Sequence, residues 1–127
     1  MPFDWANYLI LAAELRERDG EAELRTAISR VYYSVFHQAR DYLEKELRFE
    51  TSRYDSVHKR LWDEFKKHGR QFGGVGINGS RLNDARRIAD YEDEIEDLKS
   101  LVERSFHWAN KLYYRRLKNR RLKSTLP

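Results

Sequence analysis

The sequence predicts an all-α protein, an antiparallel helical bundle of four main helices plus a short helix. Its two prolines, Pro2 and Pro127, stand at the ends of the chain, so no internal position holds the residue that most strongly breaks a helix. Apolar residues recur at intervals of three and four along most of the chain, which is typical of helices with one buried face. No stretch alternates apolar and polar residues as a half-buried strand does.

Three helices are predicted in the first half of the chain. The first begins after Asp4, whose carboxylate is suited to cap it, and ends at Gly20, because glycine tolerates the left-handed turn that closes a helix. The second is the longest periodic stretch of this half and extends from Glu21 to about Leu47. The third begins near Asp55 or Ser56 and ends at Gly69.

The second half starts with a segment that is rich in glycine. Five of the six glycines lie between Gly69 and Gly79, and glycine weakens a helix by about 1 kcal/mol relative to alanine, so a connecting loop is predicted here. A phosphate-binding loop is disfavoured, because the Gly-Lys-Ser/Thr ending and the preceding strand are both missing. Ser80 is predicted to cap a short helix that contains residues 82–89, and a long helix is predicted from Glu92 to about Lys118.

Composition indicates a single folded domain. At 127 residues the chain has the usual length of one domain, and we expect one domain over residues 1–127 with a basic tail from about residue 115. Hydrophobic residues make up 40% of the chain, which is too many for a disordered protein. Charged residues make up 36%, which is too many for a membrane span. The lack of cysteine excludes disulfides, thiolate zinc sites and cysteine nucleophiles. No secretion signal is recognisable, so a cytoplasmic location is the default expectation.

The C-terminal segment is strongly basic. Every charged residue from Lys111 to Lys123 is basic, although the net charge of the whole chain is only +4. Such a tail suits contact with the phosphates of RNA, and the candidate RNA-binding residues are Arg115, Arg116, Arg120 and Arg121. A solubilising helix end, with cations opposing the negative end of the helix dipole, is the alternative.

The second helix has a polar stripe on the side opposite its apolar residues, formed by Thr26, Arg30, Ser34, His37, Asp41 and Glu44. Arg30 and His37 are seven residues apart, so they share a face at about 10.5 Å along the axis. Arginine binds phosphate with two parallel N–H groups, and histidine transfers protons near neutral pH. We therefore predict that Arg30 and His37 are the catalytic residues of an RNA-cleaving site that needs neither a metal ion nor a cofactor. An ordinary solvated face is the alternative.

Three further residues are candidates for supporting roles. Ser34 lies between Arg30 and His37, and Tyr33 lies beside them. Asp41 extends the stripe and could orient His37 or simply pair with a nearby cation such as Lys45. The other histidines, His58, His68 and His107, lack a second metal ligand on the same helical turn, so we interpret them as structural or surface residues.

The segment AISRVYYSVFH, residues 27–37, closely resembles the long helix of prokaryotic HEPN domains, which carries an arginine and a histidine separated by four to six residues. Residues 57–69 and 82–91 resemble the later helices of that family. The resemblance implies a homodimer through the second helix, in which Arg30 and His37 of both subunits form one RNA-cleaving cleft. In that cleft His37 is the acid/base and Arg30 is the phosphate clamp.

The resemblance also implies a biological setting. Family members often act as toxins or defence ribonucleases, and a small nucleotidyltransferase often serves as the antitoxin. No membrane partner is expected. Val31 stands where many active members have a polar residue. Ala39 stands where toxins that are paired with a nucleotidyltransferase often have tyrosine. A non-catalytic module that binds nucleotide or RNA, and a helical scaffold, are the alternatives.

Overall fold

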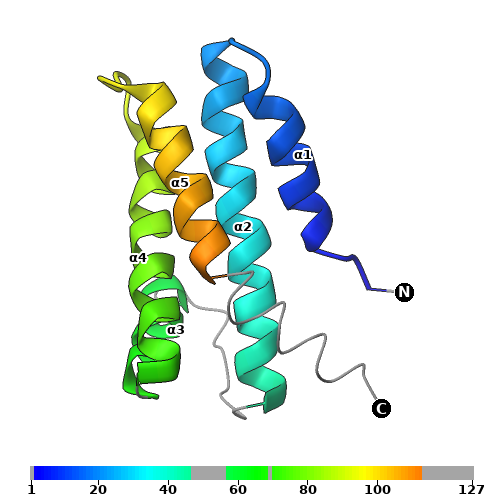
Figure 1. The fold of residues 1–127 in the computed structure, drawn as a ribbon, viewed down its shortest axis with the longest axis vertical. Helices are drawn as coiled ribbons and strands as arrows, with labels where there is room; N and C mark the ends of the chain where they lie inside the picture. Colours follow the sequence, from blue (N-terminus) through cyan, green and yellow to red (C-terminus); the bar gives the residue numbers. More distant parts are fainter. Residues whose placement is uncertain (1, 47–56, 69, 113–127) are drawn as a thin grey trace.

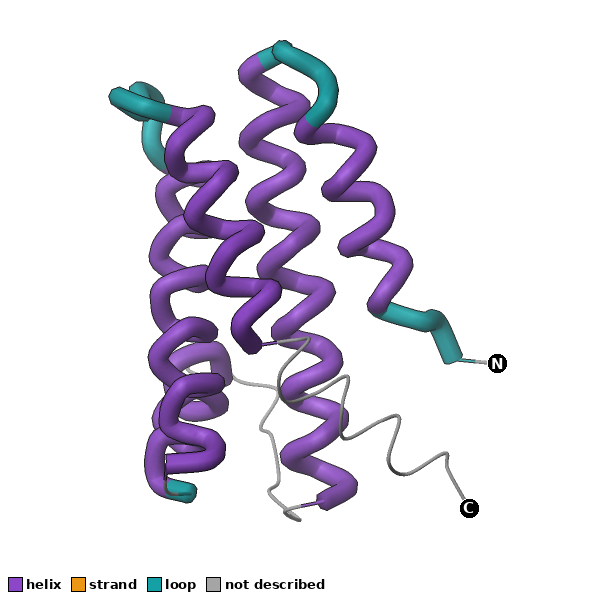
Figure 2. Tube along the Cα trace, in the orientation of Figure 1, coloured by secondary structure: helices purple, strands orange, loops and turns teal. Residues whose placement is uncertain are grey.

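The computed structural model describes residues 2–46, 57–68 and 70–112 and is drawn in Figure 1. These residues form five helices and no strand, which confirms the all-α class (Figure 2). The helices are α1 (Ala6–Arg16), α2 (Glu21–Glu46), α3 (Val57–Lys67), α4 (Arg70–Tyr91) and α5 (Leu98–Leu112). None of the helices in this described part is both long enough and apolar enough to cross a bilayer.

Helix α2 lies at the centre of the bundle. It packs against α1, α4 and α5, and α3 packs against the beginning of α4. The chain runs in opposite directions in α1 and α2 and again in α4 and α5, so the bundle consists of two antiparallel hairpins side by side (Figure 1). The apolar face predicted for α2 is the buried one, since Ile28, Val31, Val35 and Leu43 are all inaccessible to solvent.

The first three helices agree closely with the prediction. The N-cap of α1 is Trp5, one residue after the predicted Asp4, although Asp4 Oδ1 does accept a hydrogen bond from the Ala6 N–H at 3.0 Å. Helix α1 ends at Arg16, four residues before Gly20. Helix α2 starts at Glu21 as predicted and is described as far as Glu46. Helix α3 starts at Val57, next to the predicted start.

The prediction of a glycine loop is wrong, because residues 70–79 form the first half of α4. The physical reason is the contact between α4 and α3. A Cβ at Gly79 would overlap the indole of Trp62, and a Cβ at Gly76 would lie 2.5 Å from the Trp62 carbonyl oxygen. The two glycines therefore let α4 lie directly on α3, and burial of the Trp62 side chain offsets their low helix propensity. Ser80 is consequently an interior residue of α4 and caps no helix.

The last helix begins later than predicted. Residues 92–97 form the connection between α4 and α5, and Asp97 caps α5 by accepting the Ser100 N–H at 3.1 Å. The end of α4 is held by Arg25 of α2, whose guanidinium donates to the carbonyl oxygens of Ala89 (3.1 Å), Glu92 (2.5 Å) and Asp93 (3.0 Å). These carbonyl oxygens accept no hydrogen bond within a helix, so the arginine supplies the donors that the end of α4 lacks. The predicted extension to Lys118 lies outside the described residues.

Candidate functional site

The polar stripe of α2 is only partly open to solvent. Thr26, Asp41 and Glu44 are exposed, whereas Arg30 and His37 are partly buried and Ser34 is 0% exposed. The alternative interpretation of the stripe, an ordinary solvated face, therefore does not hold for its middle. The physical reason is α1, which packs along α2 (Figure 1). Trp5, just before α1, places its ring over His37, and Tyr8 in α1 places its ring over Arg30.

His37 lies beneath the indole of Trp5. The two rings are stacked with centroids 3.6 Å apart and an angle of 14° between their planes. The Nδ1 atom of His37 is buried and has no hydrogen-bond partner among the described residues. Burial, followed by the nearby charges of Arg40, His58 and Arg30, lowers the pKa of His37 to about 4. The imidazole is therefore neutral at pH 7, with a free lone pair but a lower basicity than an ordinary histidine.

Arg30 is held between aromatic rings. The carbon atom at the centre of its guanidinium lies 4.6 Å from the ring centroid of Tyr8 and 5.3 Å from that of Tyr33, within the range of cation–π attraction. Its Nη2 donates to Ser29 Oγ at 3.3 Å, while Nε is buried without a partner in the described part of the chain. The side chain is thus fixed in place but keeps donor capacity for an anion.

Tyr33 is the supporting residue that lies at the centre of the site. Its ring is 6.1 Å from the rings of both His37 and His58, and it also lies beneath the guanidinium of Arg30. The other two predicted supporting residues do not face the site in this way. Ser34 is buried with its Oγ accepting from Gln38 Nε2 at 3.1 Å, and Asp41 forms an exposed ion pair with Lys45 at 3.1 Å.

His58 belongs to this site, although the sequence indicated only a structural or surface residue. Its Nδ1 lies 2.7 Å from the hydroxyl of Tyr32, and that hydroxyl accepts a hydrogen bond from Trp62 Nε1 at 3.1 Å. Burial raises the pKa of Tyr32, so the phenol keeps its proton. The tautomer of His58 determines which of the two groups donates in this hydrogen bond. Burial and the charge of Arg86 lower the pKa of His58.

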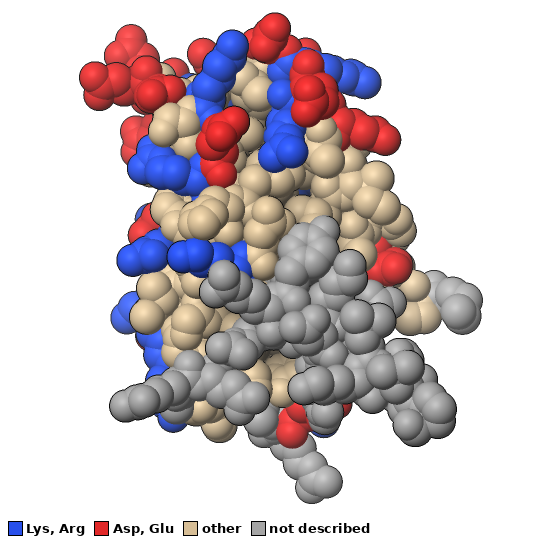
Figure 3. Space-filling model, in the orientation of Figure 1, with Lys and Arg blue, Asp and Glu red and all other residues tan. Residues whose placement is uncertain are grey.

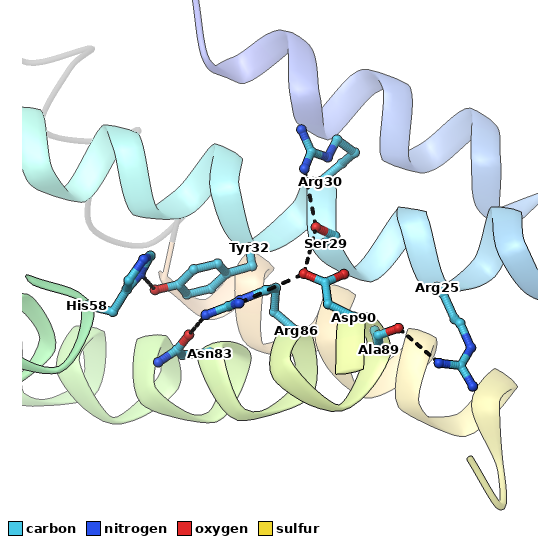
Figure 4. Close-up of polar contacts among 9 residues, drawn as sticks. All are labelled: Arg25, Ser29, Arg30, Tyr32, His58, Asn83, Arg86, Ala89 and Asp90. Atoms are coloured by element: carbon cyan, nitrogen blue, oxygen red, sulfur yellow. Dashed lines mark hydrogen bonds and ion pairs between the residues drawn. The ribbon is translucent and has the colours of Figure 1, made fainter. Parts of the chain in front are cut away.

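Arg86 of α4 is the second residue that sequence reasoning missed. It is 7% exposed, and its guanidinium carbon lies 5.4 Å from the ring centroid of Tyr32 and 5.6 Å from that of Tyr33. Its Nη2 donates to Asn83 Oδ1 at 2.7 Å, and its Nη1 lies 3.8 Å from Asp90 Oδ2 (Figure 4). The four-residue spacing of Arg86 and Asp90 could have indicated the pair, but nothing local indicates that α2 buries the arginine.

We call Arg30, His37, Arg40, His58 and Arg86, which surround Tyr33 and Phe36, the arginine–histidine cluster. Three of its members are permanent cations from α2 and α4, and its two imidazoles are neutral at pH 7 because their pKa values are lowered. Such a cluster attracts anions. Acidic side chains gather instead at the end of the bundle that holds the α4–α5 connection (Figure 3).

Two other expectations concern metal and the tail. Within the described ranges, no group of three or more His, Cys, Asp or Glu residues is placed to hold a metal ion. The candidate RNA-binding residues Arg115, Arg116, Arg120 and Arg121 lie outside the described residues.

Comparison of this chain with protein-family models, with curated proteins and with solved structures found no match. Function is therefore inferred from the geometry of the arginine–histidine cluster and from the resemblance of residues 27–37.

Proposed function

We propose that this chain is a metal-independent endoribonuclease of the HEPN type, in which Arg30 binds the phosphate and His37 moves the proton. The main support is that Arg30 and His37 flank the same ring, Tyr33, at 5.3 Å and 6.1 Å from its centroid. A phosphate beside that ring would be within reach of both side chains, one a permanent cation and the other a neutral base.

The chemistry follows from those two groups. His37 takes the proton of the ribose 2′-hydroxyl, and the resulting oxygen attacks the adjacent phosphorus atom. The bond to the 5′-oxygen breaks, and that oxygen leaves with the proton that His37 took up, which returns the imidazole to its neutral form. The products are a 2′,3′-cyclic phosphate and a 5′-hydroxyl end. Arg30 stabilises the additional negative charge on the phosphate during the attack, which is the larger contribution in reactions of this kind.

Val31 does not weaken this proposal. Its side chain is completely buried in the core, and the helix turns by about 100° from Arg30 to Val31, so the two residues lie on different faces of α2. A polar residue there would face apolar neighbours, and its absence removes no group from the site. Ala39 is buried in the same way.

The resemblance extends the proposal to assembly and biological role. We propose a homodimer through α2, acting on RNA in the cytoplasm as a toxin or defence effector, with a small nucleotidyltransferase as its antitoxin. The exposed members of the stripe, Thr26, Asp41 and Glu44, are accessible to a second copy. Light scattering at micromolar concentration should give twice the mass of one chain. The mass of a single chain would contradict the composite cleft.

A second candidate function is binding of RNA or nucleotide without cleavage. The observation that favours it is the cover over His37, because the Trp5 indole blocks one face of the ring. The low pKa also makes His37 a weaker base than an ordinary histidine. In this role a nucleobase would replace the indole on the imidazole, and the arginines would hold the phosphate.

The deciding experiment is cleavage of single-stranded RNA in the presence of a strong chelator. We expect cleavage to persist and to leave a 2′,3′-cyclic phosphate. His37→Ala should reduce the rate by about 100-fold or more, and Arg30→Lys should also impair it strongly because lysine lacks the bidentate fork. His107→Ala, an exposed histidine on α5, is the matched control and should cleave normally. A wild-type protein that binds RNA but cleaves no substrate would support the binding module instead.

A further inference from the structure

Arg86 is a buried charge whose counter-ion is poorly placed. Its Nη1 lies 3.8 Å from Asp90 Oδ2, whereas a charge-assisted hydrogen bond spans about 2.7–2.9 Å. Its Nε is buried and has no hydrogen-bond partner among the described residues. A buried guanidinium needs close partners to offset its lost hydration. Part of the donor capacity of Arg86 is therefore unused in this structure.

The Asp90 carboxylate lies between two donors without approaching either closely. Its Oδ2 accepts from Ser29 Oγ at 3.5 Å, at the outer limit of a hydrogen bond, in addition to the long contact with Arg86 (Figure 4). Ser29 Oγ in turn accepts from Arg30 Nη2 at 3.3 Å. The contacts thus form a chain in which Arg30 of α2 donates to the Ser29 hydroxyl, the hydroxyl donates to the Asp90 carboxylate, and Arg86 of α4 lies on the other side of that carboxylate (Figure 4).

We propose that Arg86, Ser29 and Arg30 form a second phosphate subsite, and that the Asp90 carboxylate occupies this subsite while no RNA is bound. A phosphate group is larger than a carboxylate and offers more acceptor oxygens, so it could accept from Arg86 and from Ser29 at ordinary distances. The rings of Tyr32 and Tyr33 hold the Arg86 guanidinium in position for it. The Asp90 side chain is 31% exposed, so it has a path to swing out toward solvent.

The proposed ligand is the RNA phosphate next to the one that is cleaved, and this assignment rests on the proposed function. Arg30 lies between Ser29 and Tyr33, so it would join the two phosphate positions. Asp90 then lowers the affinity for RNA, because the incoming phosphate must displace a like charge that already occupies the subsite.

The test is the substitution Asp90→Asn, which removes the charge and keeps the shape of the side chain. Binding of inorganic phosphate, followed by NMR, should tighten by about tenfold. Asp84→Asn is the matched control, because Asp84 is an exposed acid on the same helix and its loss changes the net charge equally. Asp84→Asn should change phosphate affinity less than twofold. Equal affinities in the two variants would overturn the proposal.

A second comparison identifies the donors and guards against misfolding. In the Asp90→Asn background, Ser29→Ala and Arg86→Lys should each return phosphate affinity toward the wild-type value. Circular dichroism verifies that the variants are folded, and Ser29→Ala provides the readout if the buried Arg86 tolerates no change. Phosphate affinity that is unaffected by Ser29→Ala in folded protein would contradict the subsite.

The source of the phosphate is tested with a 2′-O-methyl oligoribonucleotide, which cannot be cleaved through its 2′-oxygen. Its affinity should rise in Asp90→Asn together with that for inorganic phosphate. A rise for inorganic phosphate alone would overturn the assignment to RNA. Because neither measurement depends on cleavage, a protein without ribonuclease activity would refute the proposed function and leave this test intact.

Discussion

The indole of Trp5 lies flat on the imidazole of His37, with ring centroids 3.6 Å apart. Phe3 and Tyr8 pack edge-on against the same indole, at 4.9 Å and 5.3 Å between centroids. The first turn of α1 and the residues just before it therefore place an aromatic cap, formed by Phe3, Trp5 and Tyr8, on the candidate catalytic histidine. The cap excludes water from one face of the imidazole, and this loss of hydration is the main cause of the lowered pKa of His37.

Removal of the indole should raise the pKa of His37. In Trp5→Ala water reaches the imidazole, so an NMR titration should move the midpoint from about 4 toward 6.5, the ordinary value for histidine. The charges of Arg30 and Arg40 on α2 and the ring of His58 on α3 remain, so the return should be incomplete. Ile10→Ala, an exposed apolar residue on the same helix, should leave the midpoint unchanged. If the titration midpoint of His37 does not move in Trp5→Ala, the aromatic cap is not the cause of its lowered pKa.

The same pKa predicts how stability depends on pH. The folded chain holds His37 at a pKa of about 4, below the value of 6.5 in the unfolded chain, so the unfolded chain takes up the proton first as the pH falls. The free energy of unfolding should therefore decrease between pH 6.5 and pH 4. Between pH 7.5 and pH 5, the free energy of unfolding should fall by about 1 kcal/mol less in His37→Gln than in the wild-type protein. This value allows for solvent screening of the partly exposed ring. Urea denaturation at the two pH values measures it, and parallel losses in both proteins would contradict the prediction.

The two kinds of glycine in α4 should respond oppositely to alanine. Gly79→Ala pushes a methyl group into the buried Trp62 indole and should lower the free energy of unfolding by about 1–3 kcal/mol. At Gly74 a Cβ meets nothing within 4 Å, so Gly74→Ala should raise it by about 0.5–1 kcal/mol through helix propensity alone. Denaturant titrations of both variants measure the difference. Stabilisation by both would show that α4 does not lie on Trp62 as described.

The clamp on the end of α4 depends on Arg25. Arg25→Met keeps much of the apolar stem but leaves three carbonyl oxygens without their donor, so unfolding should become easier by about 1–3 kcal/mol. Arg87→Met, an exposed position on α4, removes the same charge and should have an effect within about 0.5 kcal/mol. Thermal denaturation of the two variants compares them directly, and equal melting temperatures would be inconsistent with the clamp.

The basic tail is tested by truncation. If Arg115, Arg116, Arg120 and Arg121 contact RNA phosphates, deletion of residues 115–127 should weaken binding and reduce its salt dependence. The slope of log affinity against log salt should fall by about 0.7 for each contact that is lost on single-stranded RNA. Circular dichroism controls for intact folding. Unchanged affinity and slope would favour the solubilising role of the tail.

Sequence predicts an element well here when the local signal and the tertiary contacts agree. Helix α2 is long, lacks glycine and proline, and repeats its apolar residues regularly, so its start and its buried face were predictable. In the first half of α4 the local signal and the tertiary contacts disagree. Gly76 and Gly79 locally favour a loop, but their contact with Trp62 outweighs that preference. That contact joins segments from different helices, so no local pattern reveals it.

The candidate site shows the same division. The shared face of Arg30 and His37 follows from helical spacing alone. Their cover does not, because α1 has apolar residues on several sides, among them Leu9 and the exposed Ile10, and its spacing selects no single face for α2. The role of His58 depends on Tyr32, 26 residues earlier in the chain, and only the fold brings the two together.

Arg25 also has a consequence for how the bundle folds. Its guanidinium binds carbonyl oxygens that lie 64 to 68 residues later in the chain, on the other antiparallel hairpin. Each hairpin is built from contacts between neighbours in sequence, which form quickly. The last turn of α4, however, obtains its hydrogen-bond donors only when α2 arrives. Neither hairpin is therefore complete alone, and we expect the two to assemble in one cooperative transition, with docking of α2 on α4 as the slow step.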